Sequence, residues 1–459
     1  MRRSVIILLL CCWWLGFVHG QTNNTDSLSY PGFSLLRASE DYRFLEPYRN
    51  AESGLWTKLK YIPLGDRSYL SVGGDWRTEF QVLRNEVWTE GENDSPLFVR
   101  FMLHTDWHVG ERLRIFAQLK SGHAIGRNGP PFFLNVDRLD WHQLFAAVKT
   151  GDYGKLEIGR RELTYGSRRL ISMREGTNIR QSFDGVRYIW QKKEYRLDLL
   201  AYAYNPQEIG VFDNRIRSSQ LIWGAYYVRQ PGETKTGLDL YYLGSRNESP
   251  RFEAGTEEEV RHSFGVRHWG KRGALRYNNE AVLQLGEQTG RQIRAWTVST
   301  ELYYELGGRL NLTPGMKVDI ISGDQDPNDD RLQTFNALYP RGGYFGLLAI
   351  IGPANLIDVH PCLGLEPFPG WALNFDWDVF WRHQTGDGIY FPSGRLNLEG
   401  SSSEARFIGH QLGMQVGTSI NRFFEVEMSY FYFFAGEFLD DITDGANFSQ
   451  LGFSLNYKF

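Results

Sequence analysis

The fold is decided by the stretch Leu451-Gly452-Phe453-Ser454-Leu455-Asn456-Tyr457-Lys458-Phe459. Large apolar residues occupy its odd positions, and small or polar residues occupy its even positions. Successive side chains of a β-strand point to opposite faces, so this alternation predicts a strand with one apolar and one polar face. The strand reaches the final residue and ends on an aromatic side chain, whereas the end of a soluble domain usually frays into polar residues.

A terminal aromatic strand of this kind resembles the closing strand of Gram-negative outer-membrane β-barrels. The alternative is an edge strand of a soluble β-sandwich. The same alternation recurs earlier, where Trp76 and Phe80 share one face and Asp75, Arg77 and Glu79 share the other. A sandwich buries its apolar face against a second sheet, whereas a membrane barrel turns that face to lipid. Alternation alone therefore leaves both folds open.

The lengths of the connections between strands favour the barrel. Short connections are expected at 108–111, 150–154, 191–194, 230–235, 269–272, 305–308 and 419–421. Long ones are expected at 84–97, 121–140, 161–182, 205–218, 245–258, 324–353, 384–404 and 436–446. Outer-membrane barrels have short periplasmic turns and long extracellular loops, and only a short link near 287–291 and the stretch 361–370 depart from that order. We predict an all-β fold, a transmembrane antiparallel β-barrel of about 18 strands over residues 68–459.

The N-terminal region indicates export. Met1-Arg2-Arg3 is basic, a mostly apolar run follows, and Val18-His19-Gly20 offers a cleavage site. Residues 1–20 are therefore expected to be a cleaved signal peptide, and residues 21–67 a periplasmic segment that precedes the barrel. The expected location is the cell outer membrane.

Composition agrees with an exported barrel. The chain has 459 residues and three cysteines, of which two lie in the expected signal peptide, so Cys362 has no partner for an internal disulfide. Hydrophobic residues make up 42% and aromatic residues 15%, which suits strands that meet lipid on one face and water on the other. The net charge of −4 is too small to name a partner.

One block of sequence carries a family resemblance. The block is Gly159-Arg160-Arg161-Glu162-Leu163-Thr164-Tyr165-Gly166-Ser167-Arg168-Arg169-Leu170, with Phe183-Asp184-Gly185-Val186-Arg187 after it. It resembles the alginate-export family of outer-membrane proteins, as do shorter stretches such as Leu59-Lys60-Tyr61-Ile62-Pro63-Leu64. The resemblance implies a barrel whose loops fold into a lumen that conducts an anionic polysaccharide. The implied partners are outer-membrane lipid, that polysaccharide, the periplasmic barrel-assembly machinery and a periplasmic export scaffold, with no nucleic acid.

The same block is rich in arginine, with seven between residues 160 and 187. Guanidinium groups stay charged and bind carboxylates in a bidentate manner, which suits a uronate chain. The alternative is a network of paired Arg, Glu and Asp side chains that stiffens the loop. Inward-facing acids and bases are expected in equal number, so charge count does not show a positive pore. The predicted pore-lining and substrate-binding residues are Arg100, Arg114, Arg160, Arg161, Arg187, Arg261, Arg267, Arg276 and Arg382.

No motif predicts catalysis, a cofactor or a metal ion. The acidic run from Asp324 to Asp330 lacks the glycine and terminal glutamate of an EF-hand, which favours solvated loop acids over a calcium site. We expect a channel for passive passage of an anionic polysaccharide or oligosaccharide, as in alginate export. The alternatives are a general or uptake porin for small anions and sugars, and a scaffold or adhesin that acts through its outer loops.

Overall fold

The computed structural model describes residues 32–48, 55–232, 235–346 and 348–459. The chain divides into two compact units, Met1–Ser34 and Leu35–Phe459, and the second contains the whole sheet. The signal peptide predicted for residues 1–20 lies outside the described residues.

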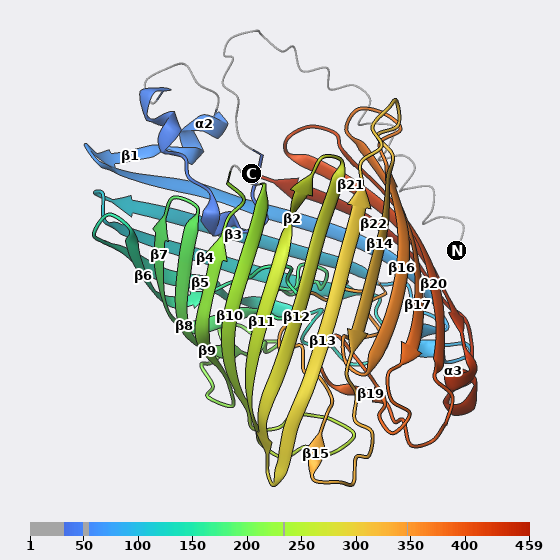
Figure 1. Cartoon of the computed structure of the whole chain (residues 1–459). Helices are drawn as coiled ribbons and strands as arrows, with labels where there is room; N and C mark the ends of the chain where they lie inside the picture. Colours follow the sequence, from blue (N-terminus) through green and yellow to red (C-terminus); the bar gives the residue numbers. More distant parts are fainter. Residues whose placement is uncertain (1–31, 49–54, 233–234, 347) are drawn as a thin grey trace. The chain divides into compact units, whose positions relative to one another are not determined.

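Eighteen strands of the described chain form a closed antiparallel barrel, which confirms the predicted fold (Figure 1). Each pairs with the next along the barrel, and the last pairs with the first. The strands are β2 (Ser68–Arg84), β3 (Leu97–Val109), β4 (Leu113–Ile125), β5 (Asp137–Thr150), β6 (Gly154–Arg161), β7 (Ser182–Lys192), β8 (Tyr195–Asn205), β9 (Gln220–Arg229), β10 (Thr236–Asn247), β11 (Glu259–Arg272), β12 (Leu275–Gln288), β13 (Arg291–Tyr304), β14 (Thr313–Ile321), β16 (Leu356–Leu365), β17 (Trp371–Arg382), β20 (Phe407–Ser419), β21 (Phe424–Ala435) and β22 (Phe448–Lys458).

The barrel closes where β22 meets β2. Trp76 lies opposite Tyr457, and Phe80 lies opposite Phe453. Closure pairs both edges of the sheet. A membrane-spanning sheet requires this pairing because lipid offers no hydrogen bonds to an open edge.

The two faces of the strands are inverted relative to a soluble protein. Trp76 and Phe80 are 52% and 41% exposed on the outside, whereas Asp75 and Arg77 are buried towards the lumen. The alternation thus places apolar side chains where lipid lies and charged side chains inside.

Long loops gather at one end of the barrel and short turns at the other (Figure 1). The predicted exception near 287–291 is a tight link, because β12 ends at Gln288 and β13 begins at Arg291. The other predicted exception, the stretch 361–370, belongs partly to β16, and its remainder, 366–370, is a short turn to β17 that keeps the short–long order.

Several short elements are not part of the eighteen barrel strands. The long loops contain η4 (Glu86–Trp88), β15 (Arg331–Leu332), β18 (Ile389–Tyr390), β19 (Leu396–Leu398) and α3 (Glu437–Ile442). Before the barrel come η2 (Arg37–Ser39), η3 (Arg43–Tyr48), α2 (Leu55–Lys60) and β1 (Ile62–Gly65). No helix among the described residues has the length and apolar character needed to cross a membrane.

Two long loops supply an apolar core inside the barrel. Leu163 and Ile171 come from the loop 162–181, and Tyr339 and Phe345 come from the loop 322–355. All four are buried in one cluster with lumen-facing wall residues such as Phe380. This core holds the two loops in the lumen, where the candidate site lies.

Candidate functional site

The loops 162–181 and 322–355 are hydrogen-bonded to each other inside the lumen. The amide of Ser172 donates to the carbonyl of Tyr339 at 2.9 Å, and the amide of Tyr339 donates to the carbonyl of Leu170 at 2.9 Å. The amide of Arg341 donates to the carbonyl of Arg168 at 3.1 Å. These hydrogen bonds join residues 168–172 and 339–341 into a short two-stranded ribbon. We call the two loops that carry this ribbon the constriction.

One wall of the barrel holds the constriction through Glu175. Arg100 of β3 donates to the Glu175 carboxylate at 2.8 Å, and Arg77 of β2 donates to the Glu175 carbonyl at 3.0 Å. Although burial raises the pKa of Glu175, the charges of Arg100 and Arg180 dominate and lower it well below the usual range of a carboxyl group. Glu175 therefore stays ionised and remains a firm anchor.

A distant part of the wall holds the same loop through Arg169. Its guanidinium lies 3.3 Å from Glu280 of β12, 2.9 Å from Glu301 of β13 and 3.5 Å from Asp319 of β14. These strands lie about half-way round the barrel from β2 and β3. The loop 162–181 is thus fixed at opposite walls and spans the lumen.

Most of the predicted pore-lining arginines are neutralised by a carboxylate. The ion pairs are Arg100–Glu175 at 2.8 Å, Arg114–Asp106 at 2.7 Å, Arg161–Glu157, Arg187–Glu157 at 2.7 Å, Arg261–Glu259 at 2.8 Å, Arg267–Asp239 at 2.9 Å and Arg276–Glu305 at 3.6 Å. They match the paired network that the sequence left open as the alternative. Their role in binding substrate stays a prediction.

Two of the predicted residues lie elsewhere. Arg160 shares its strand face with Ile158, which is 56% exposed on the outside, and it pairs with Asp184 of the next strand at 2.9 Å. Arg382 is completely buried and donates to main-chain carbonyls of the loop 383–406, among them Ala405 at 2.9 Å. Neither guanidinium faces the pore. Arg160 lies on the outward face of its strand because it is two residues from Ile158, and the loop 383–406 encloses Arg382.

Other arginines retain an uncompensated charge beside cavities in the lumen. Within the described part of the chain, none of these five has a carboxylate oxygen within 4.0 Å: Arg168, Arg174, Arg251, Arg341 and Arg395. Arg168 and Arg174 belong to the arginine-rich block, and the others come from loops far away in sequence. No sequence pattern predicts the positions of those three, since only the fold brings their loops to the lumen.

Arg168 and Arg341 line an inner cavity of about 350 Å³ between the constriction and the wall strands β2, β21 and β22. Burial, and then the charge of Arg341, lower the pKa of Arg168. Arg341 lies over the ring of Tyr344 at 5.4 Å. Arginine stays charged even when its pKa falls, so these two positive groups face a cavity that Arg77 and the carboxylates of Glu79, Glu175 and Glu427 also line.

Arg174, Arg251 and Arg395 line an outer cavity of about 390 Å³ on the extracellular side of the constriction. Arg174 is buried, and in the described part of the chain its guanidinium donates to the carbonyls of Pro340 and Pro392, each at 3.4 Å. The amide of Leu396 donates to the carbonyl of Arg251 at 2.9 Å, so Arg251 and Arg395 belong to adjoining segments of the lining. The outer cavity is therefore positive on several sides.

The backbone at the two constriction arginines is strained. Arg168 has φ of 67° and Arg174 has φ of 60°, a left-handed conformation that non-glycine residues seldom adopt. Such strain persists where the surrounding structure imposes it, and it is frequent at functional sites.

The acidic run between β14 and β15 is only partly solvated. Asp326, Asp329 and Asp330 are exposed, as expected for loop acids. Asp324 is buried, and its amide donates to Asp387 at 2.9 Å. The run therefore joins two outer loops, in addition to presenting charge to water.

The barrel is similar in fold to solved outer-membrane proteins of Pseudomonas aeruginosa. OpdK matches with a TM-score of 0.60 and 12% identity, over 85% of this chain and 98% of that chain. OccK2 (OpdF), solved in complex with glucuronate, matches with a TM-score of 0.56 and 11% identity, over 84% and 98% of the two chains. OpdK with vanillate gives a TM-score of 0.58 and 12% identity over 84% and 98%. At these identities the likeness establishes the fold.

The sequence itself has no match among curated proteins. The family model described as alginate export matches residues 68–450, which is most of the chain and nearly the whole barrel. The match includes the arginine-rich block and both segments of the constriction. The chain therefore belongs to the alginate export family of outer-membrane channels.

Proposed function

We propose that this channel carries anionic saccharides, uronate-containing polymers or their oligosaccharides, passively across the outer membrane. One observation carries the proposal. Five arginines without a carboxylate partner in the described structure line the cavities on either side of the constriction, while the predicted wall arginines are neutralised. Positive charge is concentrated along the loops that a passing solute must meet.

The chemistry of the guanidinium group suits this cargo. It binds a carboxylate through two parallel hydrogen bonds and remains charged at any physiological pH. Conduction needs several binding sites, each weak enough to release its ligand to the next. A chain with a carboxylate on each sugar is able to exchange one arginine for another as it advances.

Two proteins of similar fold were solved with carboxylates. OccK2 was solved with glucuronate, which is a uronate, and OpdK with vanillate. They support carboxylates as the ligand class for a barrel of this shape, while the family match supports a saccharide.

A second candidate is a porin for small carboxylates. The cavities of about 390 and 350 Å³ have the size of ordinary small-molecule sites, about 300–1,000 Å³. This favours a monomer or short oligomer over a long chain. The scaffold or adhesin alternative has less support, because cavities remain between the packed loops and the wall.

The test is the reversal potential of the purified barrel in a planar bilayer under a salt gradient. We expect the wild type to prefer chloride over potassium, and Arg251→Gln with Arg395→Gln to weaken that preference. Arg246→Gln is the matched control, because Arg246 lines the same cavity but pairs with Glu258 at 2.8 Å. Cation selectivity of the wild type, or an equal effect of the control, would contradict the proposal.

Added solutes separate the two candidates. Oligouronates of increasing length should block the current at lower concentrations than a monomeric uronate if saccharide chains are the cargo. A neutral oligosaccharide of matched length should block weakly. Equal block by monomer and oligomer favours the small-carboxylate porin.

A further inference from the structure

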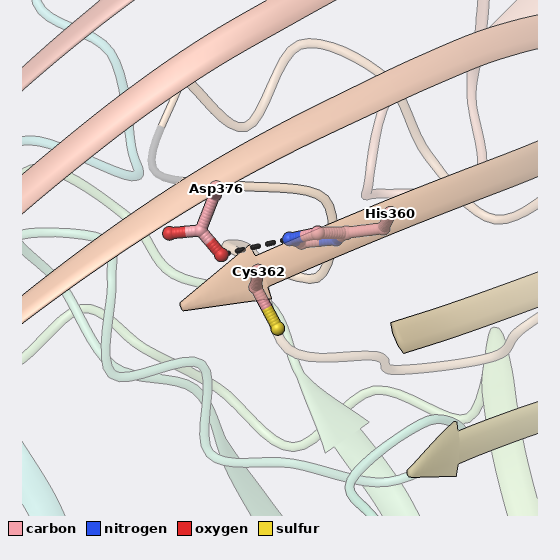
Figure 2. Close-up of side chains that lie close together, drawn as sticks. All are labelled: His360, Cys362 and Asp376. Carbon is pink, nitrogen blue, oxygen red and sulfur yellow. Dashed lines mark hydrogen bonds and ion pairs between the residues drawn. The ribbon is translucent and has the colours of Figure 1, made fainter. Parts of the chain in front are cut away.

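His360 on β16 is surrounded by carboxylates on the lumen side of the barrel wall. Its Nε2 lies 2.7 Å from Asp376 Oδ1, a contact drawn in Figure 2. Its Nδ1 lies 2.5 Å from Asp378 Oδ1 and 4.0 Å from Asp358 Oδ2. The two strands bring these residues together, because β16 supplies Asp358 and His360 and β17 supplies Asp376 and Asp378.

The side of the imidazole that faces Asp358 and Asp378 has unsatisfied polar atoms. Asp358 and Asp378 are completely buried, and His360 is 2% exposed. Within the described residues, four atoms have no hydrogen-bond partner: both oxygens of Asp358, Nδ1 of His360 and Oδ1 of Asp378. The Nδ1–Oδ1 contact is close but does not have hydrogen-bond geometry. Unpaired buried groups of this kind are costly, so a cation bound between them would stabilise the cluster.

No other basic side chain supplies that charge. Among the described residues, His360 is the only one with a basic nitrogen within 4.0 Å of an Asp358 oxygen. Lys317 lies on the opposite side of the imidazole, with its Nζ 3.5 Å from Nε2 and 4.0 Å from Asp376. The two buried aspartates are therefore left with one imidazole between them.

We propose that Asp358, Nδ1 of His360 and Asp378 bind a divalent transition-metal cation such as Zn²⁺. One atom from each residue lies within 4.8 Å of the other two. Zinc bonds of about 2.0–2.2 Å place neighbouring tetrahedral ligands about 3.4 Å apart, which lies between the 2.5 Å and 4.0 Å separations from Nδ1 to the two aspartates. Small side-chain rotations complete the site, with water as the remaining ligand.

Asp376 serves as the positioning residue. With metal bound, Nε2–H donates a hydrogen bond to Asp376, which lies 2.7 Å away, and Nδ1 is left with the lone pair that binds the metal. This carboxylate–imidazole–metal arrangement recurs in zinc sites, where the outer carboxylate fixes the ring and raises its basicity.

A second grouping shares the same imidazole but is less suitable. His360, Cys362 and Asp376 also lie within ligand distance of one another (Figure 2). There Nε2 and Asp376 already satisfy each other through a hydrogen bond. The unsatisfied atoms lie on the other side of the ring, which places the metal with Asp358 and Asp378.

The site is connected to the constriction. Gln411 donates to Asp378 at 3.0 Å and to the carbonyl of Phe345, in the loop 322–355, at 3.3 Å. A metal ion that holds Asp378 would therefore steady one attachment of that loop. It would also offset the negative charge of Asp358, Asp376 and Asp378 on β16 and β17, whatever solute the channel carries.

The experiment uses the purified full-length barrel in detergent, treated with a chelator and then titrated with Co²⁺ or Zn²⁺. We expect one equivalent to bind and Co²⁺ to give visible d–d bands without a thiolate-to-cobalt charge-transfer band. Asp358→Asn and Asp378→Asn should each weaken binding at least tenfold. Asp376→Asn should weaken it about 10–100-fold through the imidazole.

Two controls keep their affinity under this assignment. Cys362→Ser removes the thiol, and Asp106→Asn removes a buried wall aspartate that pairs with Arg114 at 2.7 Å. Every variant is checked for the gel shift on heating that marks a folded barrel, and His360→Gln replaces any aspartate variant that does not fold.

The wild type alone is able to overturn the proposal. Absence of stoichiometric binding after chelation means that Asp358 and Asp378 share a proton instead. A charge-transfer band that Cys362→Ser abolishes moves the metal to the thiol side. Tighter binding of Ca²⁺ than of Co²⁺ or Zn²⁺ contradicts a transition-metal site.

Discussion

Arg37 is hydrogen-bonded to the main-chain oxygen of Phe459 at 2.7 Å. A second guanidinium nitrogen donates to the carbonyl of Gly74 at 2.7 Å, and Gly74 and Phe459 exchange main-chain hydrogen bonds of 2.8 and 2.9 Å. Glu40 holds the same guanidinium at 2.8 Å. A residue that precedes the barrel in sequence thus secures the end of the β2–β22 seam.

Arg37→Ala should destabilise the barrel at this seam. Hydrogen bonds to a charged group contribute about 1.5–3 kcal/mol each, and here the main-chain oxygens of Gly74 and Phe459 each lose one of two donors. We expect a lower midpoint temperature for the heat-induced gel shift. Arg43→Ala is the control, because the Arg43–Asp41 pair is exposed and such pairs contribute about 0–1 kcal/mol. Equal midpoints for wild type and Arg37→Ala would show that the seam does not need Arg37.

Deleting Tyr457, Lys458 and Phe459 is a stronger change at the same place. It removes the partners of Trp76 and Asp75 on β2 as well as the acceptor for Arg37. We expect no assembled barrel in outer-membrane fractions. A truncated protein with a normal heat-induced gel shift would contradict this.

The wall arginines should govern stability more than selectivity. Glu157 accepts from Arg187 at 2.7 Å and also from Arg161, all buried. Arg187→Gln removes one counter-charge from Glu157, which keeps Arg161, and one from Asp198, which keeps Arg196. The expected cost is therefore a part of the about 3–5 kcal/mol that breaking a buried pair completely would take. Denaturant unfolding should therefore shift while the reversal potential changes little. A changed reversal potential at unchanged stability would instead support the predicted pore-lining role of Arg161 and Arg187.

The sequence predicted the barrel because period-two alternation depends on neighbouring residues alone. Trp76 and Asp75 are adjacent, and their opposite environments follow directly from the geometry of a strand. The alternation of short and long connections predicted the antiparallel order of the strands, and the sequence also indicated the tight link between Gln288 and Arg291.

The candidate site was less predictable, because its geometry depends on contacts between distant loops. The arginine-rich block was identified, but the partners that neutralise Arg100 and Arg169 lie 75 and 111 or more residues away. Arg341 and Arg395 reach the cavities only through the folding of the loops 322–355 and 383–406.

The His360 cluster was missed for a related reason. Its ligands alternate along one strand and continue on the neighbouring strand, so no helical metal motif appears in the sequence. The register of β16 against β17 creates the cluster, with Asp358 opposite Phe380 and Cys362 opposite Asp376.

Arg168 and Arg341 should set the anion preference of the inner cavity that they line. Arg168→Gln with Arg341→Gln removes two charges that have no carboxylate partner in the described structure. We expect a smaller chloride preference and weaker block by oligouronates, measured in planar bilayers. Arg196→Gln is the control, because Arg196 pairs with Asp198 at 2.7 Å. Unchanged block by the double variant would remove the inner cavity from the solute path.

The last prediction concerns pH and the contact between two outer loops. Asp324 of the loop 322–355 and Asp387 of the loop 383–406 are both buried, and Asp387 accepts from Thr334 and Tyr390 at 2.5 Å. Burial, and then the charge of Asp387, raise the pKa of Asp324 to about 7. Burial also raises the pKa of Asp387 to about 6. The docked loops therefore hold protons more tightly than free carboxyl groups, whose ordinary pKa is 3.8.

Stabilisation from this difference is fully present below about pH 4 and is lost as the pH rises through 6 to 7. Hydrogen exchange of residues 322–334 and 383–390, corrected for the intrinsic rate, should show more protection at pH 5 than at pH 8. Each pKa unit corresponds to about a tenfold change in the opening equilibrium. Asp324→Asn should flatten the dependence, whereas Asp330→Asn, in the same loop but exposed, should preserve it. Protection that increases with pH would mean that the two carboxylates are held by cations and do not depend on protonation.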